Sequence, residues 1–480
     1  MKLKITAKEL REMGYPQSPV IPVAMEIMQT HYKYHTTEEA TTILKNVLAD
    51  PSSFLDDEIL YKIAERLTER KTVSDPEISL NNSGIPFNTF GSEHIEPSAM
   101  QQMYIAAKLP VSRAGALMPD AHHGYGLPIG GVLATENAII PYGVGVDIGC
   151  RMCLSIFDLH PSELKAKESF FVKELDDATL FGSGAQFKTA SNHEVMENPL
   201  FTEIPLLRSL HGKAWKQLGS SGSGNHFAEF GIVTISEEDE ILKTKPGQYI
   251  GLLTHSGSRA LGALIAGHFT KLAKQKRRLP KDASNLAWLD LNEEEGMEYW
   301  LSMNLAGDYA SACHHIIHDK IAKRLHTKPI RRVENHHNFA WKEMHEGREL
   351  IVHRKGATPA GKNVLGIIPG SMTATGYIVK GKGETASVNS ASHGAGRILS
   401  RTAAMNIITP KAMRDILEEY DVILMGGGLD ESPFVYKDID MVMKAQQNLV
   451  DVVGSFKPKI VKMAGNEGRP YKKKGHESVE

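Results

Sequence analysis

One histidine of this chain stands in an unusual setting, within the stretch SASHGAGRILSR. His393 is surrounded by small residues, and Gly394 and Gly396 allow close backbone approach of a ligand. Arg397 and Arg401 follow, and the forked guanidinium group suits phosphate. The stretch predicts a nucleotide or phosphate bound beside a histidine. Neither the P-loop spacing nor a G-x-G-x-x-G fingerprint is present, so such a nucleotide would bind through an uncommon fold.

A second candidate site lies in the stretch GVGVDIGCRM. Asp147 and Cys150 are three residues apart in a glycine-bounded turn, so both side chains can point at one place. A carboxylate and a thiolate together suit a divalent transition metal. The alternative is that Cys150 and Cys153 form a C-x-x-C zinc or redox pair. A structural zinc site would need a second such pair, and a thioredoxin-like motif would need a βαβ context.

Three histidines share another pattern, since each lies where an apolar stretch meets a Gly, Ser or Asn turn. They are His226 in GNHFAE, His255 in HSGSR and His337 in HHN. Imidazole is a common ligand of the same metals, so these residues are candidate partners of the thiolate and carboxylate. A further group, His314, His315 and His318, lies inside an expected helix. We interpret that group as structural, because a histidine stands where the zinc-protease motif needs Glu.

Two more stretches have phosphate-binding character. VHRKGATPAG places Arg354 and Lys355 before a glycine, and the run PGSM at 369–372 predicts a tight turn. No lysine occurs in the K-x-D-G context of ordinary nucleotidyl-transferring ligases. That absence returns attention to His393.

Composition restricts the class of protein. The chain has 480 residues, of which 41% are hydrophobic and 23% charged, and its formal net charge is −2. These values are typical of a globular protein, and any nucleic-acid site must be a local groove. The first residues contain no apolar signal-peptide core, and no run of 18 apolar residues occurs. With only three cysteines, we expect a cytoplasmic protein that binds no membrane.

The expected elements fall into four regions. Residues 1–71 predict a helical extension with capping boxes at Thr6 and Thr36. Residues 72–98 have the composition of a linker, and residues 466–480 form a basic tail that we expect to be disordered. Residues 99–465 predict one large α+β domain. Within it we expect helices over 262–325 and 439–453, and strands around 349–353, 364–368, 377–379 and 422–425.

The motifs together resemble the RtcB family of RNA ligases. The stretches DIGC, GNHFAE, HSGSR, HHN, HRKGAT, PGSM, SHGAGR and YKDID occur in that order between residues 99 and 465. The resemblance implies the family's own α+β fold. It also implies that an RNA 3′-phosphate or 2′,3′-cyclic phosphate end is joined to a 5′-hydroxyl end with GTP and manganese. Such ligases act in tRNA splicing or RNA repair, and the resemblance also raises an archease-like activating protein as a partner.

The resemblance assigns roles position by position. His393 would accept GMP from GTP, and two manganese ions would be bound with Cys150 bridging them. The implied metal ligands are Asp147, Cys150, His226, His255 and His337. The implied guanylate site comprises Asn225, His226, Phe227, Ala228, Glu229, His337, Asn338, Pro369, Gly370, Ser371, Met372, His393, Gly394, Ala395, Gly396 and Lys462. Gly376 stands where many members have a serine that contacts guanine.

Other classes remain open at this level. A dinuclear metal phosphodiesterase would use the same ligands without His393, and a non-catalytic RNA-binding module would need neither. The joint presence of SHGAGR, PGSM and the ligand set favours the ligase.

Overall fold

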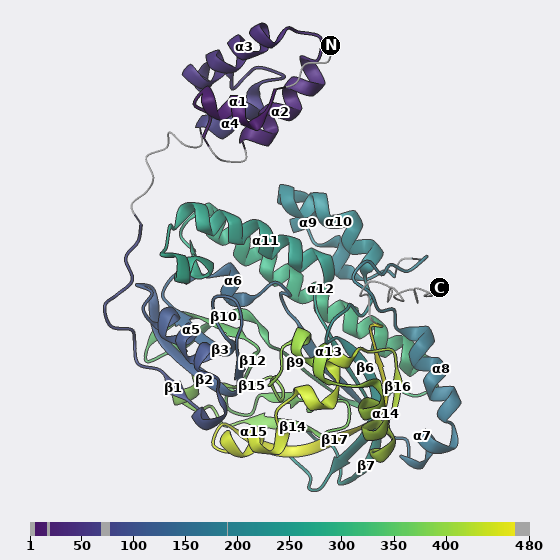
Figure 1. Cartoon of the computed structure of the whole chain (residues 1–480). Helices are drawn as coiled ribbons and strands as arrows, with labels where there is room; N and C mark the ends of the chain where they lie inside the picture. Colours follow the sequence, from purple (N-terminus) through teal and green to yellow (C-terminus); the bar gives the residue numbers. More distant parts are fainter. Residues whose placement is uncertain (1–4, 17–19, 69–76, 190, 466–480) are drawn as a thin grey trace, which may run out of the picture. The chain divides into compact units, whose positions relative to one another are not determined.

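The computed structural model describes residues 5–16, 20–68, 77–189 and 191–465 of the chain (Figure 1). The chain divides into two compact units, Met1–Pro76 and Glu77–Glu480. The expected tail at 466–480 lies outside the described residues. No helix formed by the described residues is both long and apolar enough to cross a membrane.

The first unit is helical. Thr6 and Thr36 each accept a hydrogen bond from the backbone of the glutamate three residues later, whose side chain bonds back, as a capping box requires. Apolar residues at helical spacing then pack into one cluster between Ile5 and Leu67. The helices are α1 (Ala7–Glu12), α2 (Val20–His31), α3 (Thr37–Ala49) and α4 (Tyr61–Thr68).

The second unit is built around a large sheet of eight strands. The order along it is β13-β14-β17-β6-β7-β5-β9, with β16 pairing beside β17. Every pair is antiparallel except β16 with β17. The strands are β5 (Arg151–Phe157), β6 (Phe227–Ile235), β7 (Gly247–Ser256), β9 (Pro329–His336), β13 (Leu365–Ile368), β14 (Gly376–Gly381), β16 (Ile423–Met425) and β17 (Val450–Met463).

Helices cover one face of this sheet. The long helix α12 contacts β5 and β7, and α8 contacts β6 and β17. Because side chains alternate along a strand, every second residue of these strands points to the helices and the others point to the opposite face. Figure 1 shows α11 lying beside α12. The larger helices of the unit are α5 (Pro97–Ala107), α8 (Glu168–Ala178), α10 (Pro205–Gln217), α11 (Arg259–Lys276), α12 (Glu294–Arg324) and α14 (Pro410–Glu419), and the shorter ones are α6 (Pro141–Val144), α7 (Ser162–Ala166), α9 (Leu200–Glu203), α13 (Arg401–Ile407) and α15 (Ile439–Ala445).

A second sheet of five strands has the order β1-β2-β3-β11-β10. Two short strand pairs, β12 with β15 and β4 with β8, complete the unit. The strands are β1 (Asn88–Thr89), β2 (Ser112–His122), β3 (Ile129–Thr135), β4 (Ala138–Ile139), β8 (Leu289–Asp290), β10 (Asn338–His345), β11 (Arg348–Lys355), β12 (Ala357–Pro359) and β15 (Ser390–Ser392).

The expected α+β class is confirmed, as are the four short strands predicted between residues 349 and 425. The helix expected over 439–453 is wrong beyond Ala445. From Val450 the chain is the strand β17, because its alternating side chains pair with β14 and β6. Residues 77–98 also differ from the expected linker. They belong to the second unit, where partly buried side chains such as Ile85 and Phe87 pack on its core.

Candidate metal centre and nucleotide pocket

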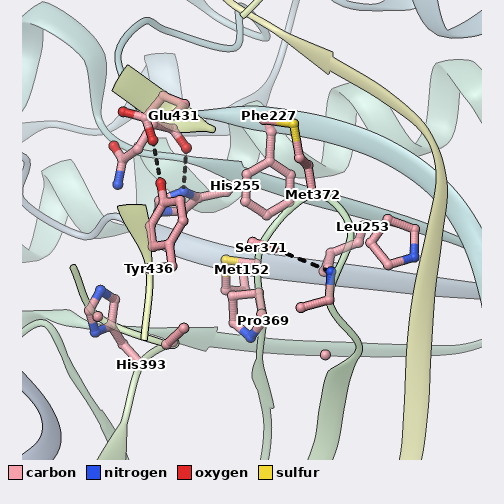
Figure 2. A pocket seen from close by; sticks show the side chains of 18 of the residues that line it. Met152, Phe227, Leu253, His255, Pro369, Ser371, Met372, His393, Glu431 and Tyr436 are labelled. Atoms are coloured by element: carbon pink, nitrogen blue, oxygen red, sulfur yellow. Dashed lines mark hydrogen bonds between the residues drawn. The ribbon is translucent and has the colours of Figure 1, made fainter. Parts of the chain in front are cut away.

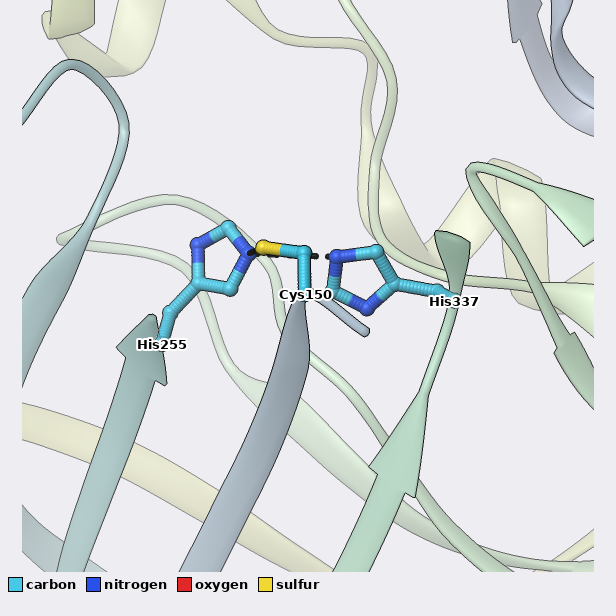
Figure 3. Close-up of side chains that lie close together, drawn as sticks. All are labelled: Cys150, His255 and His337. Carbon is cyan, nitrogen blue, oxygen red and sulfur yellow. Dashed lines mark hydrogen bonds between the residues drawn. The ribbon is translucent and has the colours of Figure 1, made fainter. Parts of the chain in front are cut away.

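Three of the candidate ligands meet at one edge of the large sheet. Cys150 directly precedes β5, His255 is the next-to-last residue of β7, and His337 directly follows β9. Since β7 and β9 both run antiparallel to β5, the start of β5 lies beside the ends of its two neighbours. Cys150 Sγ is 3.1 Å from His255 Nε2, which is 3.2 Å from His337 Nε2 (Figure 3).

Asp147 and His226 form a second group around the same thiol. His226 directly precedes β6, whose first residue pairs with His255 on β7. Its Nε2 lies 2.9 Å from Asp147 Oδ2 and 3.5 Å from Cys150 Sγ. Two groups could therefore hold a metal ion, and Cys150 belongs to both: Cys150, His255 and His337 form the first group, and Asp147, Cys150 and His226 the second.

The protonation of this cluster suits metal binding. His255 Nδ1 donates to the carbonyl of Asn225 at 3.1 Å, so the lone pair of the ring is on Nε2 and faces Cys150. Burial lowers the pKa of His255 to about 3 and brings the pKa of His337 well below its ordinary value, so both rings are neutral. Burial, reinforced by Asp147, raises the pKa of the Cys150 thiol. A bound cation would offset that increase, since thiolates and neutral imidazoles are its natural ligands.

The C-x-x-C interpretation fails on the geometry of β5. Cys150 and Cys153 are an odd number of positions apart along an extended chain, so their side chains lie on opposite faces of the sheet. All three cysteines are buried and free. Cys153 lies near His314 and His318 on the helix-covered face, as a further group of potential ligands. Both ring nitrogens of each of these histidines already have hydrogen-bond partners, which favours the structural interpretation.

A pocket opens beside the metal centre on the face of the sheet away from α12. Its cavity volume is about 360 Å³. In Figure 2, His393 lies at one side of the pocket, and Phe227, Leu253 and Met372 lie at the other. Most of the expected guanylate residues line it: Asn225, Phe227, Glu229, His337, Pro369, Gly370, Ser371, Met372, His393, Gly394, Ala395 and Gly396. Gly376 also lines the pocket.

His393 is held in one orientation by a buried carboxylate. Asp120 on β2 is fully buried, and its Oδ2 accepts hydrogen bonds from the backbone N–H of His393 at 3.1 Å and from Nδ1 at 2.7 Å. Because Nδ1 carries the proton, the lone pair of His393 is on Nε2. The rings of His393 and His337 have centroids 4.9 Å apart. A nucleophilic imidazole nitrogen therefore lies beside the first metal-binding group.

Four of the expected guanylate residues do not line the pocket. One of them, His226, belongs to the second metal-binding group, and the other three lie elsewhere. Ala228 packs in the cluster on the helix-covered face, and Asn338 accepts a hydrogen bond from the backbone of Gly356 at 2.9 Å. Lys462 also points away from the pocket, because Val461 and Met463 on either side of it are the pocket-lining residues of β17. Its Nζ lies 2.8 Å from Asp176 Oδ1. Alternation along β17 therefore directs the Lys462 side chain to the face of the sheet away from the pocket.

The arginines near the site are engaged in ion pairs. Arg397 and Arg401 line the pocket, but both pair with Glu431, which is buried beside them. Arg354 is fully buried, pairs with Glu343 and donates to Ser390 Oγ at 2.7 Å. It therefore braces β11 against β15, the strand that leads to His393.

From the sequence, no role in this site was assigned to Asp120, Glu431 or Tyr436. Asp120 lies beside the histidines of PDAHHGYG in the sequence. It is 273 positions from its partner His393, so no local pattern connects the two. Glu431 and Tyr436 are hydrogen-bonded to each other (Figure 2). Tyr436 opens the YKDID stretch, which suggested no role at the pocket, and Glu431 lies five residues before it.

Comparison with known proteins agrees with this architecture. The family model described as tRNA-splicing ligase RtcB matches residues 102–203 and 205–464. An RNA-splicing ligase RtcB of Escherichia coli K12 is 32% identical over 417 residues, which cover 80% of this chain and 97% of the relative. A tRNA-splicing ligase RtcB of Methanococcus maripaludis is 29% identical over 423 residues, covering 73% of this chain and 88% of the relative.

The fold and the site thus define a protein with buried groups that could hold metal ions and a pocket lined by a histidine beside them. The match over most of the chain places it in a family: the chain belongs to the RtcB family of tRNA- and RNA-splicing ligases. The first unit, up to Pro76, lies outside the matched residues.

Proposed function

We propose that this protein is a GTP- and manganese-dependent ligase that joins an RNA 3′-phosphate or 2′,3′-cyclic phosphate end to a 5′-hydroxyl end. The observation that carries the proposal is the orientation of His393. Asp120 holds its Nδ1 proton, which leaves Nε2 as a nucleophile at the side of the pocket and beside the first metal-binding group. Histidine can form a covalent phosphoryl intermediate in this way.

The proposed reaction has three steps. His393 Nε2 attacks the α-phosphorus of GTP, a P–N bond forms, and pyrophosphate leaves. The RNA 3′-phosphate then takes the GMP from His393, which regains its lone pair, and an RNA-(3′)pp(5′)G end results. The 5′-hydroxyl of the second strand attacks the RNA phosphorus, loses its proton and releases GMP. A cyclic phosphate end would first be opened by water.

The residues of the chain have distinct roles in this scheme. Asp120 positions His393, and the pocket between His393 and the side formed by Phe227 and Met372 accommodates the guanosine. The two groups that share Cys150 would hold two manganese ions, which would supply charge neutralisation at the phosphates. The RNA ends of tRNA splicing or repair would be the substrates in the cytoplasm, with an archease-like activator as a partner.

A dinuclear phosphodiesterase is the second candidate, because it would use the same metal ligands. It would not need a histidine fixed by a buried carboxylate, or a pocket of nucleotide size beside it. These two features favour nucleotidyl transfer.

The test uses GTP labelled at the α-phosphorus, together with manganese. After denaturing electrophoresis the wild type should carry label that acid removes and mild alkali does not, because phosphoramidates are acid-labile. His393→Ala should carry none, whereas His268→Ala, at an exposed histidine of α11, should label normally. Label retained on the His393→Ala protein would refute the assignment.

The same variant separates the first step from the last. Given an RNA end that already carries GMP on its 3′-phosphate, His393→Ala should still join it to a 5′-hydroxyl end, because only positioning and metals are then needed. Failure to join this substrate, with manganese still bound, would show that His393 also acts after guanylylation.

A further inference from the structure

An aromatic pair, Tyr125 and Tyr142, lies outside the pocket described above. Tyr125 is in the loop between β2 and β3, and Tyr142 is in α6. Their ring centroids are 6.4 Å apart in an edge-to-face arrangement. Tyr125 is 69% exposed and stands between Gly124 and Gly126. Rings presented in this way can stack on nucleobases, since every base has a π-face.

A buried cation accompanies the pair. Lys355 Nζ lies 5.2 Å from the centroid of the Tyr142 ring and donates to the backbone carbonyl of Tyr125 at 2.6 Å. Lys355 is 9% exposed, and burial lowers its pKa to about 8. Among the described residues, no carboxylate forms an ion pair with it. A buried charge without a counter-ion is costly, so an incoming phosphate would stabilise this arrangement.

The pair is continuous with the reaction centre. The strand that enters the Tyr125 loop carries Asp120, which orients His393, and α6 leads directly into the turn that carries Asp147 and Cys150. Gly356, next to Lys355, is so close to His393 that a Cβ there would be 3.2 Å from its Cε1. Tyr125 therefore lies close along the chain to Asp120, which orients the nucleophile, and Tyr142 lies close to the turn that carries Asp147 and Cys150.

We propose that Tyr125 and Tyr142 form a stacking platform for the base of the last nucleotide of the 3′-phosphate RNA strand, with Lys355 facing its phosphate. This inference rests on the proposed function. The 3′-phosphate strand is favoured over the 5′-hydroxyl strand by charge. Its terminus carries a phosphate dianion that matches the unpaired Lys355, whereas the other strand has no phosphate at its end.

The experiment measures joining at varied concentrations of each strand for Tyr125→Ala and Tyr142→Ala. The KM for the 3′-phosphate strand should rise roughly fivefold or more, the range expected for loss of one base stack. The KM for the 5′-hydroxyl strand and the labelling of His393 by GTP should stay as in the wild type. Tyr125→Phe should restore the KM, because the ring is kept. Tyr420→Ala, at an exposed tyrosine just after α14, is the matched control.

A second arm uses a 3′-phosphate strand whose last nucleotide lacks its base. This substrate should have a raised KM with the wild type, and Tyr125→Ala should not raise it further. Additive effects of the two changes would overturn the proposal, as would a KM increase confined to the 5′-hydroxyl strand. A wild type that neither labels with GTP nor joins RNA would instead refute the proposed function.

Discussion

At the scale of single residues, Cys150 is the side chain on which both metal-binding groups depend. It is the one member common to both metal-binding groups, whereas His255 and Asp147 each belong to one. Cys153, three positions away, faces the helices on the other side of the sheet. The two cysteines of the C-x-x-C stretch therefore have separate roles.

This difference predicts the metal content of three variants. Cys150→Ala should lose more bound manganese than His255→Ala, because removal of a shared ligand weakens both groups at once. Cys153→Ala should keep manganese near the wild-type amount. Elemental analysis of the purified proteins measures both outcomes. Equal losses in the two cysteine variants would favour the C-x-x-C interpretation.

At the scale of elements, a directional chain of hydrogen bonds links β9, β5, β7 and α12 behind the metal centre. Arg332 Nε donates to Ser155 Oγ, which lies 2.8 Å from His318 Nδ1. Thr254 Oγ1 lies 2.8 Å from His318 Nε2 and 2.6 Å from His314 Nδ1.

The last hydrogen bond of this series determines which group donates at every step. His314 Nε2 lies 3.1 Å from the carbonyl oxygen of Ser256, which can only accept, so His314 carries its proton on Nε2. Thr254 must then donate to His314 and accept from His318. This single arrangement satisfies every member and anchors β7 next to His255.

Thr254→Val tests this chain, since valine has nearly the same shape without the hydroxyl. His314 Nδ1 would lose its donor and His318 Nε2 its acceptor, and both groups are fully buried. We expect the free energy of unfolding to fall by about 2–4 kcal/mol, measured by urea denaturation of the metal-free protein.

Thr270→Val on α11 is the control. The Thr270 hydroxyl is buried and has no hydrogen-bond partner among the residues that the structure describes, so its loss should leave stability unchanged or raise it. Equal destabilisation by the two substitutions would show that the hydrogen bonds of Thr254 contribute nothing to the free energy of unfolding beyond the burial of the side chain.

At the scale of the whole molecule, the two units have separate hydrophobic cores. The cluster between Ile5 and Leu67 belongs to the first unit, and the second unit begins at Glu77 with Ile78 donating to the carbonyl of Arg278. A unit with its own core can unfold as its own cooperative unit.

Removal of the first unit therefore should change neither the thermal stability of the second unit nor its labelling by GTP. A chain of residues 77–480 should melt within about 2 °C of the main transition of the full protein in calorimetry. It should also be labelled by GTP to the same extent. A drop of several degrees, or loss of labelling, would show that the second unit depends on the first.

Local patterns in the sequence were sufficient to predict helix caps, turns and candidate ligands of this protein. Capping boxes at Thr6 and Thr36 and the glycine turns around Asp147 and His393 depend on neighbours a few positions away. The candidate ligands could be named because Asp147 and Cys150 share a glycine-bounded turn and each of the three histidines lies where an apolar stretch meets a turn. Eight ordered motifs also pointed to one family.

Tertiary structure alone decided which groups meet. Antiparallel pairing of β5 with β7 and β9 brings Cys150 to His255 and His337, and packing of β2 against the turn after β15 brings Asp120 to His393. The face to which Lys462 points follows from the register of β17, since a shift of one position reverses every side chain. Such contacts join residues hundreds of positions apart, and no local spacing encodes them.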